Sequence, residues 1–217
     1  MHEEEKYIFE KLSDFHLDAL QEVGNIGAGQ AATALTQFLN RSTYMSIPNV
    51  ALDNVKSIHT LVKMPSDQEL AIISLRTVSD LKYALLVFFD KLSVAKIINL
   101  MTTSAPDLVQ MNLSELSPLY LSLIKETGSI LLLKYLEALN YFLKANSFPS
   151  PPQLRIGTID SLDEYELKEV NQDPSTVLVV ECDIFTSERN IAVDLAIVPQ
   201  SDTFDSFMKS LFSEEMY

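Results

Sequence analysis

One short segment, Asp18-Ala-Leu-Gln-Glu22-Val-Gly-Asn25, contains three polar side chains that could take part in hydrolysis. An α-helix turns by about 100° per residue, so Glu22 lies about 40° from Asp18, and Asn25 about 60° from Glu22. All three side chains therefore share one narrow stripe. Two carboxylates four residues apart repel each other, and no Lys or Arg lies nearby on the stripe to offset them. Helix stability alone does not favour this pattern, which indicates a binding or catalytic face.

The same segment holds three of the five glycines of the chain, Gly24, Gly27 and Gly29. Inside a helix each glycine costs about 1 kcal/mol relative to alanine, so we expect something to approach this backbone closely. One interpretation is tight packing of the helix on a sheet while the acidic residues face water. Another is a loop that cradles a phosphate. The spacing fits neither a dinucleotide fingerprint nor a Walker loop, and the acids would repel a phosphate that arrives without a cation.

Composition limits the function classes. The 217 residues are 47% hydrophobic, which predicts a globular fold, and the formal net charge of −14 disfavours nucleic acid or an anionic membrane as a partner. The lone Cys182 allows no internal disulfide, and His2, His16 and His59 are scattered, so we expect no metal site. The start of the chain is acidic and no apolar run reaches a spanning length, so we expect a cytoplasmic protein without a membrane anchor.

Hydrophobic spacing predicts two long helices, each followed by three strands and a shorter helix. The first set is a helix at about 14–40, strands at about 43–55, 69–78 and 82–89, and a helix at Lys91–Met101, after which Thr102–Asp107 reads as a linker. The second set is a helix at about Leu113–Ala145, a turn at Phe148–Pro152, strands at about 153–160, 176–186 and 190–198, and a helix at Phe204–Phe212. An acidic stretch at 160–169 reads as a solvated loop.

The two sets keep a common register, because Glu22 and Glu126 are 104 positions apart and so are Pro48 and Pro152. This indicates an internal duplication, with repeats at about 12–103 and 112–217. Two like halves most simply merge their strands into one sheet. We therefore expect an α/β protein of the α+β type. Residues 1–217 would form a single pseudo-twofold domain with one mainly antiparallel sheet and the long helices packed on it.

The segment at 17–35 closely resembles the signature of the CheC family of bacterial chemotaxis phosphatases, a group that also includes CheX and FliY. The pattern of that family is Asp or Ser, three residues, Glu, two residues, Asn, twenty-two residues, Pro. It is met here by Asp18, Glu22, Asn25 and Pro48. The duplicated organisation is also similar to that family, so the resemblance covers the chain from about residue 12 onward.

The resemblance implies hydrolysis of the aspartyl phosphate on CheY, the response regulator that sets flagellar rotation. It implies that Asn25 orients the attacking water, that Glu22 pairs with a lysine of the receiver, and that Asp18 helps to dock this partner. Gly29 would keep the approach open. The receiver would bring Mg²⁺, so the chain needs no cofactor of its own. The alternative is a non-catalytic binding module that sequesters phosphorylated CheY or the receptor deamidase CheD.

The second copy departs from this pattern. Ser122 takes the place of Asp18 and Glu126 that of Glu22, while Ser129 and Leu133 replace the amide and the open glycine. A serine hydroxyl is too short to reach into the cleft of a partner as an asparagine amide does. We therefore expect one working site, with the second helix a docking remnant or plain structure.

Overall fold

The fold is taken from a computed structural model, which describes residues 14–54, 58, 62, 67–78, 81–102, 112–162, 176–187 and 190–199. The helix predicted at Phe204–Phe212, the linker beyond Thr102 and most of the acidic stretch at 160–169 lie outside these residues. His2 and His59 lie outside them too, and the side chain of His16 is not described.

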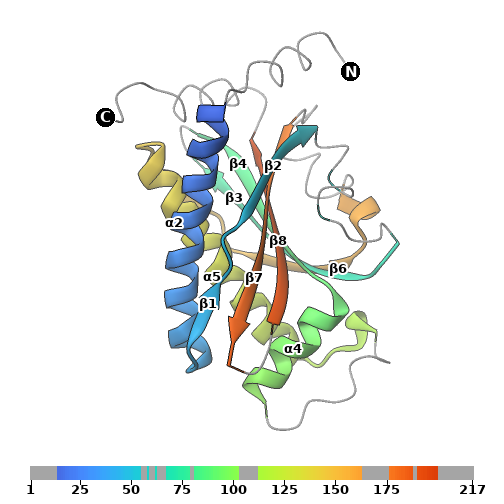
Figure 1. The fold of residues 1–217 in the computed structure, drawn as a ribbon. Helices are drawn as coiled ribbons and strands as arrows, with labels where there is room; N and C mark the ends of the chain where they lie inside the picture. The colour runs from blue at the N-terminus through green and yellow to red at the C-terminus, as the bar shows by residue number, and fades with distance from the viewer. Residues whose placement is uncertain are drawn as a thin grey trace.

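Three α-helices and one antiparallel sheet make up the described fold (Figure 1). The helices are α2 (Asp14–Leu39), α4 (Lys91–Met101) and α5 (Pro118–Phe142). The strands are β1 (Thr43–Met45), β2 (Asn49–Asn54), β3 (Leu70–Val78), β4 (Tyr83–Phe89), β5 (Phe148–Pro149), β6 (Gln153–Gly157), β7 (Thr176–Thr186) and β8 (Asn190–Pro199). This architecture confirms the predicted α+β class.

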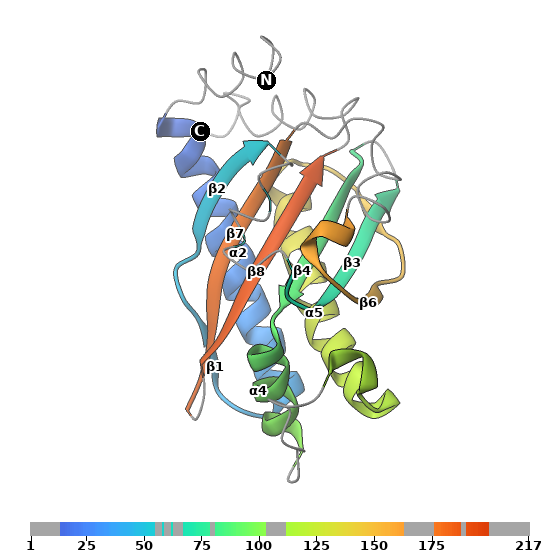
Figure 2. The same ribbon diagram turned by 90° about the vertical axis from the view of Figure 1, so that its right-hand side faces the viewer.

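The sheet is buried on both faces, which explains its apolar central strands. The main core lies between one face of the sheet and the long helices α2 and α5, and a smaller core covers part of the other face (Figures 1 and 2). Every residue of β4 is buried as a result. A strand covered on both sides reads as a continuous hydrophobic run, as Tyr83–Phe89 does.

The observed boundaries differ from the predicted ones at several places. The strand predicted at about 43–55 is divided into β1 and β2, and the strand predicted at about 153–160 ends at Gly157. Helix α5 begins at Pro118, not near Leu113, because the Ser117 side chain accepts a hydrogen bond from the Tyr120 N–H and proline fits the first helical turn. Residues Leu113–Glu115 form a separate 3₁₀ turn. The predicted turn at 148–152 contains the short strand β5, which pairs with β3.

The strand order has the symmetry that the predicted duplication requires. The order β1-β7-β8-β4-β3-β5, with β2 also on β7 and β6 also on β3, reads the same from both ends when each strand is exchanged for its counterpart in the other half. Edge strands of each half therefore pair with the other half. Asn40 and Lys144, which follow the two long helices, both have φ of 50° and are 104 positions apart. The duplication itself stays a prediction that these observations support.

A β-bulge interrupts the edge formed by β1 and β2. Residues 46–48 lie opposite only two residues of β7, 182 and 183, so the edge carries one extra residue. Ser46 joins the bulge to β7 with two hydrogen bonds. Its N–H donates to the Asp183 carbonyl at 2.9 Å, and its Oγ accepts from the Asp183 N–H at 2.9 Å. Both backbone groups of Asp183 are therefore satisfied by Ser46 at the bulge.

The opposite edge repeats this bulge. Residues 150–152 lie opposite residues 75 and 76 of β3. The Ser150 N–H donates to the Arg76 carbonyl at 2.7 Å, and the Arg76 N–H donates to Ser150 Oγ at 3.0 Å. Both prolines of the sequence motif, Pro48 and Pro152, are therefore the last residues of serine-bridged bulges.

Glycine lets α2 and α5 approach each other closely. A Cβ built on Gly27 would lie 2.6 Å from Cδ1 of Tyr135 in α5, closer than two carbon atoms can pack. The Tyr135 ring is fully buried, so it has no room to move away. Gly27 is thus required by the packing of the two long helices.

We expect Gly27→Ala to lower the free energy of unfolding and Gly29→Ala to raise it. Overpacking costs about 1–3 kcal/mol, which exceeds the roughly 1 kcal/mol that alanine adds as a helix former, so Gly27→Ala should lose about 1 kcal/mol. A Cβ at Gly29 meets no atom within 4 Å, so Gly29→Ala should gain up to about 1 kcal/mol. Urea denaturation of both variants measures the difference, and equal shifts would contradict it.

Candidate functional site

The predicted stripe lies on the surface of α2. Asp18, Glu22 and Asn25 are all exposed, as is Gly29 one turn further on. Within the part of the chain that the structure describes, none of the three polar side chains makes a hydrogen bond or an ion pair. Their carboxylate and amide groups are therefore available to a partner.

The motif proline holds the first bulge against this helix. Pro48 is buried, and a Cβ built on Gly24 would lie 3.0 Å from Cγ of Pro48 and 3.2 Å from Cγ2 of Val50. The side-chain amide of Gln21 also donates a hydrogen bond to the Pro48 carbonyl. Gly24 and Gln21 flank Glu22 in the sequence, so the bulge is fixed directly beside the polar stripe.

A hollow of about 310 Å³ separates Asn25 from the bulge. Its walls come from Asn25, Ala28, Gly29 and Ala32 on α2 and from residues 44–48 on the bulged edge. A Cβ built on Gly29 would meet no atom within 4 Å, whereas a Cβ on Gly24 or Gly27 would lie against side chains of other elements of the fold. The interpretation of packing on a sheet therefore holds for Gly24, whereas Gly27 packs against helix α5, and Gly29 alone of the three glycines is open.

The second helix does not repeat this arrangement. Ser122 and Glu126 are exposed on α5, but Ser129 is only 7% exposed, and its hydroxyl donates to the Lys125 carbonyl at 2.6 Å. Leu133 is half-buried and packs against the main core. The three polar residues of the second copy thus do not form a continuous exposed stripe. The hydroxyl that replaces the asparagine amide is used within the helix.

Cys182 is buried in β7, as the sequence indicates for a small apolar thiol. Burial raises its pKa to about 12, a shift that contact with the Tyr135 hydroxyl partly opposes. Because a thiolate is the reactive form of cysteine, this thiol is inert at neutral pH. The side chain serves packing between the sheet and α5.

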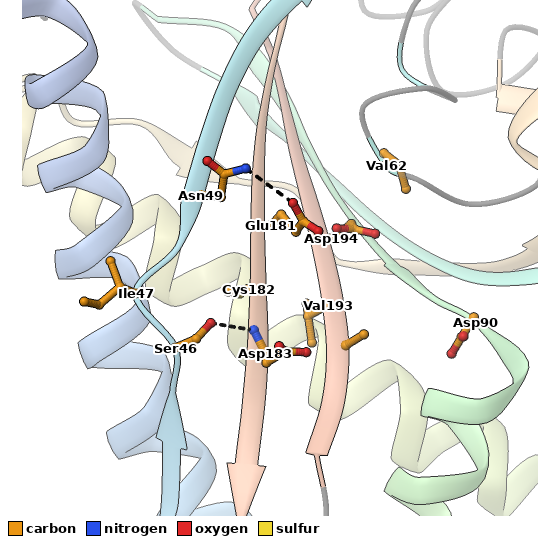
Figure 3. A pocket seen from close by; sticks show the side chains of 11 residues that line it. Ser46, Ile47, Asn49, Val62, Asp90, Glu181, Cys182, Asp183, Val193 and Asp194 are labelled. Carbon is orange, nitrogen blue, oxygen red and sulfur yellow. Dashed lines mark hydrogen bonds between the residues drawn. The ribbon is translucent and has the colours of Figure 1, made fainter. Parts of the chain in front are cut away.

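A second hollow, of about 360 Å³, lies on the opposite face of the sheet and was not anticipated from the sequence. Its lining includes four acidic residues: Asp90, Glu181, Asp183 and Asp194 (Figure 3). The signal in the sequence that could have revealed this hollow is the alternation of Glu181 and Asp183 with apolar residues in one strand.

Among the described residues, no group of three or more His, Cys, Asp or Glu is arranged to hold a metal ion. No described helix combines the length and the apolar character needed to cross a membrane.

The motif on α2 is similar to that of a known protein family. Residues 15–51, which include the whole motif, match the model of the CheC-like family. The chain is 29% identical over 212 residues to the CheY-P phosphatase CheC of Bacillus subtilis (strain 168), a match that covers 94% of this chain and 97% of that protein.

Solved structures show the same fold. FliY of Thermotoga maritima matches with a TM-score of 0.70 and 23% identity, covering 93% of this chain and 98% of that one. A chain of the FliM-SpeE complex from H. pylori matches with a TM-score of 0.66 and 10% identity, covering 93% and 96%. This chain is thus similar to the CheC-like family in the motif on α2, to a CheC protein along nearly its whole length, and to FliY in its fold.

Proposed function

We propose that this CheC-like protein is a phosphatase that hydrolyses the aspartyl phosphate of a CheY-type response regulator. The observation that carries the proposal is the exposed Asn25 amide, without a hydrogen-bond partner in the described part of the chain, between two exposed carboxylates and an open hollow. The relative from Bacillus subtilis, which carries the name CheY-P phosphatase, supports the same activity.

Asn25 is suited to position the attacking water. Its amide offers a donor and an acceptor and does not titrate, so it can hold one water in line with the phosphorus at any physiological pH. The water oxygen attacks phosphorus, the bond to the aspartyl oxygen breaks, and inorganic phosphate and a free carboxylate result. The receiver supplies the phosphoryl group, and we expect its own Mg²⁺ to neutralise the phosphoryl oxygens.

Glu22 and Asp18 are suited to dock the receiver. Both carboxylates are exposed and have no ion-pair partner among the described residues, so a lysine of the receiver can pair with Glu22 without displacing another cation. The formal net charge of −14 adds long-range attraction for a basic surface. The deamidase CheD stays a second candidate partner from the sequence resemblance.

The decisive experiment follows dephosphorylation of a purified CheY-type receiver, with and without this protein. Release of inorganic phosphate above the intrinsic rate of the receiver supports the proposal. Binding of the phosphorylated receiver without faster release would instead favour the sequestering module.

We expect Asn25→Ala to lower kcat by about 100-fold, because water positioning is lost, with little change in KM. The fold should remain intact, since Asn25 is exposed and alanine is the better helix former. Gln37→Ala is a matched control, because Gln37 is another exposed amide on α2 and does not line the hollow. A full rate in Asn25→Ala would remove the catalytic role.

We expect Glu22→Lys to weaken receiver binding by about tenfold and Glu22→Gln by only a few-fold. The lysine adds like-charge repulsion to the loss of an exposed ion pair. Glu126→Lys makes the same charge change at the exposed counterpart on α5 and should leave binding nearly unchanged. Calorimetric titration of the receiver measures all three, and equal affinity of the two Glu22 variants would exclude the contact.

We expect Ser129→Ala to leave the phosphatase rate unchanged within about twofold, because the hydroxyl is bonded to the Lys125 carbonyl and does not face a partner. In an Asn25→Ala background, Ser129→Asn alone should restore little activity, since Leu133 occupies the position of the open glycine. Ser129→Asn with Leu133→Gly could open a second site at about 1 kcal/mol in helix stability plus lost packing. A clear loss of rate in Ser129→Ala would contradict the one-site interpretation.

A further inference from the structure

The first bulge turns an aliphatic side chain outward beside Asn25. Met45 and Val50 both pack against the main core, although they are separated by an odd number of positions, because the bulge adds one residue to the edge. In an unbroken strand Ile47 would point inward with Met45. Instead Ile47 is 83% exposed, and Figure 3 shows it directed from the bulge toward α2.

Ile47 lines the same hollow as Asn25. A single exposed aliphatic residue is ordinary on a protein surface. Here, however, the opposite wall consists of Ala28, Gly29 and Ala32, whose side chains extend no further than Cβ, so that wall is apolar. The side chains with polar groups in the lining are Asn25, Tyr44 and Ser46. Its 310 Å³ lies at the lower end of the range for ligand pockets, about 300–1,000 Å³, which suits a protruding side chain.

The surface around Asn25 thus has two chemically distinct sides. The carboxylates of Asp18 and Glu22 precede Asn25 along α2, and the apolar helix wall of the hollow, which Ile47 also lines, follows it. In the second half, the bulge has Pro151 at the position of Ile47, and helix α5 has Leu133 at the position of Gly29. The aliphatic residue, the open glycine and the amide are therefore present together in one half and absent together in the other.

We infer that Ile47 is a specificity-determining residue that contacts an apolar side chain of the receiver next to its phosphoaspartate. The inference rests on the proposed function and specifies which groups the receiver presents. A cationic side chain of the receiver lies on one side of the phosphoryl group, and an aliphatic or aromatic side chain lies on the other. The acidic side of the stripe selects the cation, and the continuous hollow beside Asn25 takes the apolar group.

The test is steady-state hydrolysis of a CheY-type receiver phosphorylated with acetyl phosphate. Ile47→Ser should raise KM about tenfold, the loss expected for one aliphatic contact, with kcat within about twofold because Ile47 does not touch the phosphoryl group. Leu92→Ser is the matched control, since Leu92 is 55% exposed on α4 and does not line the hollow. This control should keep both constants.

Gly29→Leu provides a second variant, which fills the hollow without meeting an atom within 4 Å of its Cβ. It should also raise KM by about tenfold or more while circular dichroism stays that of the native protein. An unchanged KM in both variants, with an active native protein, would overturn the inference and leave the proposed function standing. A native protein that binds the receiver but releases no phosphate would overturn the proposed function, and calorimetric titration of Ile47→Ser would still decide the contact.

Discussion

The contact between Pro48 and Gly24 sets the geometry on which the site depends. Because Gly24 has no side chain, the proline ring lies against the backbone of α2, and Gln21 adds a hydrogen bond to the Pro48 carbonyl. These contacts fix the bulged edge of the sheet beside the helix. The exposed carboxylates and amide lie on the helix, while Ile47 lies on the bulge, so these contacts bring them together on one surface.

The sheet that supports this contact is shared between the two halves. Strands β1 and β2 come from the first half, but they pair with β7 of the second, and the Ser46 bridge to Asp183 crosses the same boundary. The hydrogen bonding of the bulge is repeated at Ser150, yet the exposed polar stripe is not repeated on α5. The serine-bridged bulge can thus be present in both halves while only one half carries the exposed carboxylates and amide, since the hydrogen bonds of the bulge do not involve these groups.

Much of the fold and part of the site follow from the sequence. Helical spacing predicts that Asp18, Glu22 and Asn25 share a face, and the structure places all three on the surface of α2. Helix α5 begins later than predicted because the apolar spacing extends upstream of Ser117, whose side chain caps the first turn of the helix. The bulge could not be predicted, because one extra residue breaks the alternation that identifies strand faces. The separate roles of Gly24, Gly27 and Gly29 depend on neighbours from other elements, which a helical pattern does not contain.

The exposed groups around Asn25 contribute little to the stability of the free protein. The carboxylates lie unpaired among the described residues on one stripe, where they repel each other, and Ile47 leaves its aliphatic surface in water. Gly29 gives up helix propensity without the close packing that justifies Gly27. Each of these costs is small, but all fall on one surface. Interactions that are unfavourable or absent in the free chain can become favourable when a cation, a phosphoryl group and an apolar side chain arrive together. Under the proposed function, the binding free energy is therefore gained only in the complex with the receiver, where it can orient the water for hydrolysis.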